Sequence, residues 1–139
     1  MKISAFTVVV VAFAATAVFS PAGRVAAQDP GSASELSIDE NLVKKGKTLW
    51  TQRACSGCHS IGKGKLAGPD LAHLTDRRSV DWVKKWLGNT TSMLESDETA
   101  KALLAEYNNT KMPDFKMKDE DAMAVIHYIA KESQKVKKK

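Results

Sequence analysis

The chain has 139 residues, a formal net charge of +5 and only two cysteines. This length is that of one small domain. The excess of positive charge is mild, and no clustered basic face with interleaved aromatic residues appears in the sequence. Nucleic-acid binding is therefore not expected, because it depends on such a face.

Residues 1–27 have the pattern of a secretory signal peptide. Lys2 provides a positive start, residues 3–19 are almost uninterrupted apolar sequence, and small residues precede a cleavage position after Ala27. A second possible cut lies after Ala22. The apolar stretch is at the short limit for crossing a bilayer, so we favour cleavage over a retained membrane anchor. We expect the remaining protein in the periplasm, tethered to the membrane only if this segment is kept.

The rest of the chain divides into three parts. Residues 28–36 are rich in small and polar residues and are expected to form a flexible lead-in. Residues 37–134 carry the helical patterns and form the predicted domain. Residues 135–139 are a basic tail, which we interpret as a solvated helix end; the alternative is a docking role.

Four segments of the predicted domain have apolar residues at helical spacing, and no segment alternates apolar and polar residues as a half-buried strand does. We therefore predict an all-α fold. Ser37 and Glu40 form a capping-box pattern at the first helix, and capping or acidic residues also open the others. The four helices are expected to begin at Ser37, Ser79, Asp97 and Asp119.

The segment Cys55-Ser56-Gly57-Cys58-His59 contains both cysteines of the chain. Cysteines at i and i+3 with histidine at i+4 fall on one side of a helical turn. In this arrangement two thiols can bond the two vinyl groups of one haem while the imidazole binds its iron. We predict one covalent haem c per chain, attached at Cys55 and Cys58, with His59 as an iron ligand.

Other uses of this motif are less well supported. A zinc site needs about four ligands, and only the distant His73 and His127 could complete one. A thioredoxin-like pair calls for a βαβ context that the sequence lacks. A disulfide across a two-residue gap would remove little loop entropy.

Pro69, in Gly68-Pro69-Asp70-Leu71, is a candidate partner of His59. Its carbonyl can accept a hydrogen bond from the second ring nitrogen of an iron-bound histidine, which must be held by some acceptor. The alternative is a plain Gly-Pro turn.

Met112 is the candidate for the second iron ligand. The following Pro113 disfavours helix at Met112, so this residue should lie in an extended strap. A thioether is a soft ligand that stabilises Fe(II) and raises the redox potential. The alternatives are gap-filling by Met112 and a second histidine ligand, His73 or His127, although both histidines are expected at or near the surface.

The segment from about Ser37 to Ser133 resembles a class I c-type cytochrome. It has, in order, a helix with Gly46 and Trp50, then CSGCH, GPDL and KMP, and a last helix with Tyr128. The resemblance implies a small cytochrome c fold of about four helices around one haem. It also implies that the first helix packs on the last one, and that Pro69 and Met112 have the roles given above; the expected contacts of the first helix are Val125, Tyr128 and Ile129.

Trp82 and Trp86 lie four residues apart on one predicted helix. Core packing is the simpler interpretation for both. The alternative is that an indole N–H group, or Arg77 or Arg78, donates a hydrogen bond to a haem propionate.

The resemblance further implies an electron carrier, not an enzyme, that shuttles one electron between respiratory redox proteins in the periplasm. We expect a monomer. The alternatives are a membrane-anchored subunit of a respiratory complex and a haem enzyme or gas sensor with a labile sixth ligand. Six lysines either border an exposed haem edge and steer an acidic partner or are merely solvated: Lys63, Lys65, Lys84, Lys85, Lys111 and Lys116.

Overall fold

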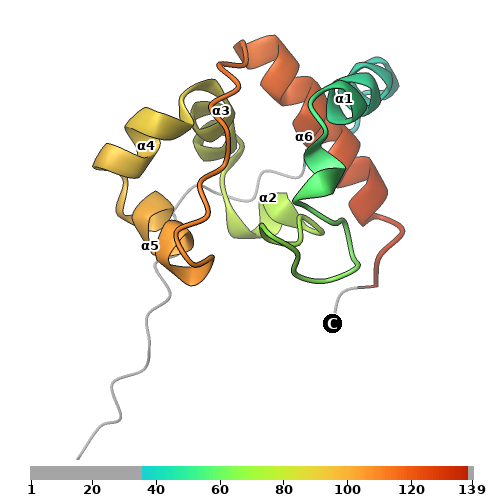
Figure 1. Cartoon of the computed structure of the whole chain (residues 1–139). Helices are drawn as coiled ribbons and strands as arrows, with labels where there is room; N and C mark the ends of the chain where they lie inside the picture. The colour runs from blue at the N-terminus through green and yellow to red at the C-terminus, as the bar shows by residue number, and fades with distance from the viewer. Residues whose placement is uncertain (1–35, 138–139) are drawn as a thin grey trace, which may run out of the picture.

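The computed structural model describes residues 36–137, and this part of the chain is helical without strands (Figure 1). The all-α prediction is confirmed. The predicted signal peptide, almost all of the lead-in and the last two residues lie outside the described range. The elements are α1 (Glu40–Gln52), the 3-10 turn η1 (Cys55–Gly57), α2 (Leu74–Arg77), α3 (Val80–Gly88), α4 (Thr90–Ser96), α5 (Glu98–Glu106) and α6 (Asp119–Ser133).

Local capping explains where the main helices begin. Ser79 and Asp97 cap α3 and α5 with their side chains, and α6 begins at Asp119, as predicted. The predicted capping box at Ser37 is wrong. Asp39 is the N-cap of α1, and its carboxylate accepts hydrogen bonds from the backbone N–H groups two and three residues further on. A carboxylate there also interacts favourably with the helix dipole.

Two short helices are not predicted by the sequence patterns. Asn89 follows α3 and also caps α4, because its side chain accepts a hydrogen bond from the backbone of Ser92. Gly88 and Asn89 therefore form a corner between α3 and α4. Helix α2 is a single turn that begins after His73, too short to show a period in the sequence.

Helices α1 and α6 cross at Gly46. A Cβ atom at this position would overlap the backbone carbonyl of Ala124 and lie 2.8 Å from the Cβ of Tyr128. The ring of Trp50 packs on Tyr128 with the centroids 5.7 Å apart. Trp50, Val125 and Ile129 belong to the same buried core. The packing implied by the resemblance is therefore confirmed, and it depends on the missing side chain of Gly46.

His127 is buried, contrary to the prediction that it lies at or near the surface. Its side chain is on α6 with only 3% of its surface exposed. The Nδ1 atom accepts a hydrogen bond of 3.1 Å from the backbone N–H of Asp39. Burial lowers the pKa of His127, with a smaller opposing effect of the Asp39 charge. A neutral imidazole thus ties the start of α1 to α6.

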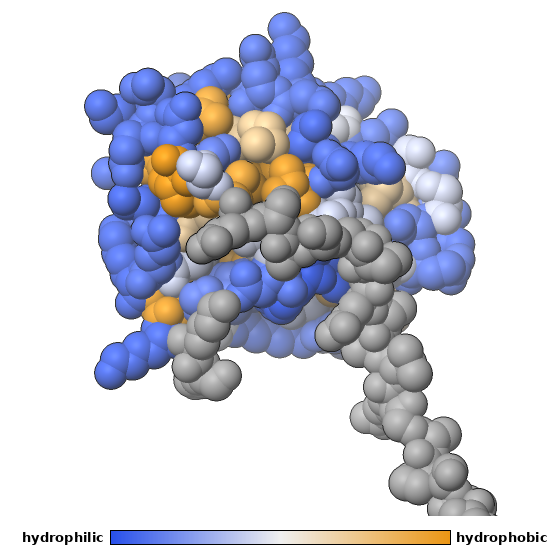
Figure 2. Space-filling view, turned by 180° about the vertical axis from the view of Figure 1, so that it is seen from behind, coloured by the Kyte–Doolittle hydropathy of each residue, from blue (hydrophilic) through white to orange (hydrophobic). Residues whose placement is uncertain are grey.

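The described part of the chain contains no helix long and apolar enough to span a membrane. Seen from behind, most of the visible surface is hydrophilic, and apolar side chains gather in one area within it (Figure 2).

Candidate functional site

Both cysteines and His59 lie on the turn that follows α1. The backbone N–H groups of Cys58 and His59 both donate to the carbonyl of Cys55, at 3.2 and 2.9 Å. The two thiols are free, and all three side chains line one apolar cavity. Burial raises the pKa of the Cys55 thiol. The predicted grouping of two thiols and one imidazole is therefore present.

His59 is held in one tautomer by Pro69. Its Nδ1 lies 2.9 Å from the carbonyl oxygen of Pro69. Because a carbonyl can only accept a hydrogen bond, Nδ1 carries the proton and Nε2 keeps a lone pair. Burial lowers the pKa of His59 and outweighs the opposing effect of the bond to Pro69. The side chain therefore presents a neutral imidazole with a free Nε2, the form that binds a metal ion.

Gly68 is part of this site, although no functional role for it is predicted from the sequence. A Cβ atom at Gly68 would lie 2.5 Å from Cε1 and 2.8 Å from Nδ1 of the His59 ring. Only glycine lets the ring come this close to the backbone. The signal in the sequence is a glycine directly before the proline that holds the histidine.

Asp70 organises the loop between His59 and Pro69. Its carboxylate accepts hydrogen bonds from the backbone N–H groups of Gly62 (2.8 Å), Gly64 (2.5 Å) and Ala72 (2.8 Å). The two glycines have positive φ angles of 81° and 91°, which other residues rarely adopt. A single carboxylate thus binds the backbone within this loop, at Gly62 and Gly64, and just after it, at Ala72.

We expect the stability conferred by Asp70 to be lost in acid. Burial would raise the pKa of Asp70, but hydrogen bonds from Ala72, Gly62, Gly64 and Ser60 outweigh it and lower the pKa from 3.8 to about 2. Because the folded pKa lies below the unfolded one, the contribution is complete above about pH 5 and disappears as the pH falls through about 2. Because Asp70 is partly open to solvent, which screens its interactions, the contribution is about 1–2 kcal/mol, less than the full shift would give.

The measurement is urea unfolding of the haem-loaded protein between pH 6 and pH 2, for the wild type and Asp70→Asn. The difference in unfolding free energy should shrink as the pH falls. Glu95→Gln, which neutralises an exposed carboxylate, is the matched control and should show little difference at any pH. A constant difference for Asp70→Asn would contradict the assignment.

Two stacked tryptophans from α3 line the same cavity. The rings of Trp82 and Trp86 are 5.5 Å apart and inclined by 9°. The indole N–H of Trp82 donates to the carboxylate of Asp97 at 3.2 Å, and that of Trp86 donates to the sulfur of Met112 at 3.0 Å. Both N–H groups therefore have partners within the protein.

Met112 lies between α5 and α6, in the segment 107–118, which we call the Met112 segment. Residues 110–118 form no helix, so the predicted extended strap is present. The half-buried Met112 side chain lines the same cavity as His59. In Figure 1 the Met112 segment and η1 lie on either side of the middle of the fold. The structure thus brings both candidate iron ligands to one cavity; coordination by Met112 stays a prediction.

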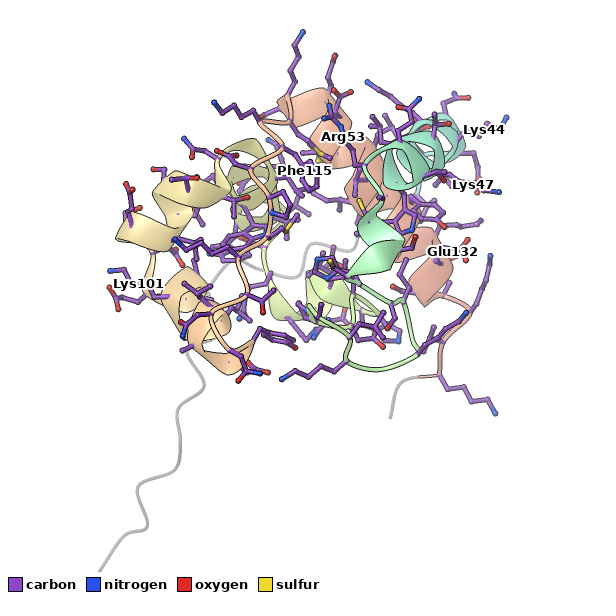
Figure 3. The ribbon with its side chains drawn as sticks, in the orientation of Figure 1. Lys44, Lys47, Arg53, Lys101, Phe115 and Glu132 are labelled. Atoms are coloured by element: carbon purple, nitrogen blue, oxygen red, sulfur yellow. The ribbon has the colours of Figure 1, made fainter. Side chains whose placement is uncertain are left out.

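Contacts between cations and aromatic rings link the Met112 segment to the other side of the cavity. The guanidinium of Arg53, directly after α1, lies 5.9 Å from the centroid of the Phe115 ring, and the two side chains approach each other in Figure 3. The ammonium of Lys65 lies 4.1 Å from the centroid of the Tyr107 ring. Each contact contributes about 0.5–1 kcal/mol at an exposed site.

The two arginines before α3 differ in their surroundings. Arg77 is exposed and donates to the carbonyls of Asp70 and Ala72, at 2.7 and 3.0 Å. Arg78 is half-buried over the ring of Trp82, and its Nε atom is buried without a hydrogen-bond partner. Both line the cavity. A buried N–H without a partner costs about 1–3 kcal/mol, so Arg78 fits an acidic group of a bound molecule.

These observations fit a haem. The cavity offers two free thiols, an imidazole with an available Nε2, a thioether, apolar walls and the unpaired Nε of Arg78, which suits a propionate. Neither of the other histidines lines it. The Nε2 of His73 lies 3.1 Å from the carbonyl of Val136, and His127 is occupied at the start of α1. The alternative of a second histidine ligand therefore has no support in this geometry.

Comparisons with known proteins also indicate a haem protein. The cytochrome c family matches residues 43–133. The solved cytochrome c from Rhodothermus marinus is 27% identical, with a TM-score of 0.65, and the match covers 71% of this chain and 83% of that one. The cytochrome c domain of the pp3183 protein from Pseudomonas putida is 32% identical, with a TM-score of 0.56, and the match covers 64% and 88%. No curated protein sequence matches the chain.

The match to the family contains both cysteines, His59, Pro69 and Met112. It covers well over half of the chain and nearly all of the helical domain. The chain belongs to the cytochrome c family and carries haem c, bound covalently at its Cys-Ser-Gly-Cys-His motif.

Proposed function

We propose that this protein is a periplasmic electron carrier whose single haem iron is bound by His59 and Met112. Haem-based electron transfer is the general activity of the family. The observation that carries the proposal is the placement of His59 and Met112 in one cavity, each held by its own hydrogen bond. If both side chains bound the iron, they would leave no position on it for a substrate.

In this proposal each side chain of the site has a defined role. The haem, when bound, supplies a one-electron Fe(II)/Fe(III) couple. His59 would bind the iron through Nε2, while Pro69 fixes the ring and raises its basicity. Met112 supplies a soft sulfur that favours Fe(II) and raises the potential. The stacked tryptophans of α3 form part of the apolar wall of the cavity.

Transfer between respiratory proteins in the periplasm is also part of the proposal. Periplasmic location rests on the signal-peptide pattern of residues 1–27. Two of the six candidate docking lysines are placed near the cavity: Lys111 lines it, and Lys65 lies over Tyr107 at its edge. Lys84 is instead paired with Asp119 at 2.8 Å. An acidic redox partner docking over Lys65 and Lys111 would be steered by their charge.

The proposed function predicts that the reduced protein does not bind carbon monoxide rapidly near neutral pH, because the sixth position is filled. It also predicts fast oxidation by hexacyanoferrate(III), an anionic one-electron reagent, with a rate that falls as ionic strength rises. Stopped-flow absorbance measures both rates. Rapid carbon monoxide binding would favour the haem enzyme or gas sensor. An oxidation rate that does not change with ionic strength would contradict the proposed role of the lysines.

A further inference from the structure

The sulfur of Met112 has a hydrogen-bond donor in the wall of the cavity. The indole Nε1 of Trp86 lies 3.0 Å from the Sδ atom, which is short for a contact between nitrogen and sulfur. A thioether sulfur has two lone pairs, so one can accept this hydrogen bond while the other stays available to a metal. The sulfur can therefore accept this hydrogen bond and bind a metal at the same time.

This donor matters because the backbone around Met112 lies outside the helices. Residues 110–118 form no helix, so helical hydrogen bonds do not fix the position of the sulfur. The segment is attached at Asp114, whose carboxylate accepts from the backbone N–H of Thr90 at 3.3 Å, and at Met117, whose N–H donates to the carbonyl of Leu87 at 3.0 Å. The contact to Trp86 is the one that reaches the sulfur itself.

Trp86 is well placed to hold the sulfur, because its own position is fixed from two sides. The hydroxyl of Thr90, only 1% exposed, donates to the backbone carbonyl of Trp86 at 2.9 Å. The ring stacks on Trp82, which is in turn bonded to Asp97, the N-cap of α5. The donor therefore sits on a rigid element, as a preorganised group requires.

We propose that Trp86 is a positioning residue that acts through Met112: its N–H holds the sulfur at the cavity and withdraws electron density from it. A sulfur that donates less to the metal disfavours Fe(III), so the contact raises the redox potential. This inference rests on the proposed ligation by Met112. The other indole, Trp82, donates to a carboxylate and has no such effect through the sulfur.

The test compares the redox potentials of the haem-loaded wild type, Trp86→Phe and Trp82→Phe. Each variant removes one indole of the same stack, but only Trp86→Phe removes the donor to Met112. We expect Trp86→Phe to lower the potential by up to about 59 mV, a tenfold change in the equilibrium constant of a one-electron couple. Trp82→Phe should shift it by clearly less. Equal shifts in both variants would overturn the inference, because they would reflect only the loss of an indole.

A second measurement does not need the Trp86 variant to fold. Nitrogen-15 NMR of the reduced protein follows hydrogen exchange of the indole N–H groups. Met112→Leu, kept diamagnetic by bound carbon monoxide, should speed the exchange of the Trp86 N–H and leave that of Trp82 much less affected. Unchanged exchange at Trp86 would overturn the inference.

The ferric spectrum of the wild type separates this inference from the proposed function. If the wild type lacks the absorption band of methionine-ligated ferric haem, the ligand assignment itself is wrong, and the inference falls with it. If the band is present while the potentials of the two tryptophan variants agree, only the role of Trp86 is wrong.

Discussion

Replacement of Met112 by alanine should abolish the absorption band of methionine-ligated ferric haem and lower the redox potential by more than about 60 mV. That shift is more than tenfold in the equilibrium constant of a one-electron couple. The reason is the loss of a soft thioether that favours Fe(II). The sixth position would open to water and to added ligands, so the reduced variant should bind carbon monoxide rapidly.

Spectroelectrochemistry of the purified haem protein measures the first two effects, and rapid mixing with carbon monoxide measures the third. Met123→Ala is the matched control. Met123 is also half-buried against the core, but it lies on α6 and does not line the cavity. Its replacement should cost some stability and leave the band and the potential in place. A Met112→Ala protein with an unchanged spectrum would rule out Met112 as the ligand.

Gly46→Ala should be among the most destabilising single substitutions in this chain, because Gly46 lies where α1 and α6 cross. The new Cβ would overlap the carbonyl of Ala124 and crowd Tyr128, so α1 and α6 would have to move apart. Overpacking of this kind costs about 3 kcal/mol, and the better helix propensity of alanine returns about 1 kcal/mol. The net loss of about 2 kcal/mol should lower Tm by about 10 °C.

Urea unfolding of the haem-loaded protein, followed by circular dichroism, measures this loss. The control is Gly57→Ala, in the turn between the two cysteines, where a Cβ would meet nothing within 4 Å. This variant should unfold within about 0.5 kcal/mol of the wild type. Equal stabilities of the two variants would show that the crossing of α1 and α6 tolerates a side chain.

The sequence predicts well those features that depend on residues within about one helical turn of each other. Ser79 and Asp97 cap the helices that follow them, as their side-chain types indicate. Cys55, Cys58 and His59 share one turn because of their spacing. Capping fails only where two candidates compete: Asp39, a carboxylate, displaces Ser37 at the start of α1.

The bond between His59 and Pro69 spans ten residues and was still predictable. Its basis is chemical, since a metal-bound histidine needs an acceptor for its second nitrogen and a proline carbonyl can be one. The contacts of Asp70 are harder to predict from the sequence. Its three backbone donors depend on the path of a loop with two glycines at positive φ, and no pattern in the sequence states that path.

By itself, the sequence determines the helical class, the attachment of haem and the order of its candidate ligands, because these follow from local spacing and from the chemistry of single residues. Only the tertiary structure decides which distant groups meet. The buried His127 accepts a hydrogen bond from the backbone N–H of Asp39, 88 residues away. The sulfur of Met112 receives the N–H of Trp86, 26 residues away. Such contacts depend on how whole helices pack, and the pattern of one segment carries no information about the position of another.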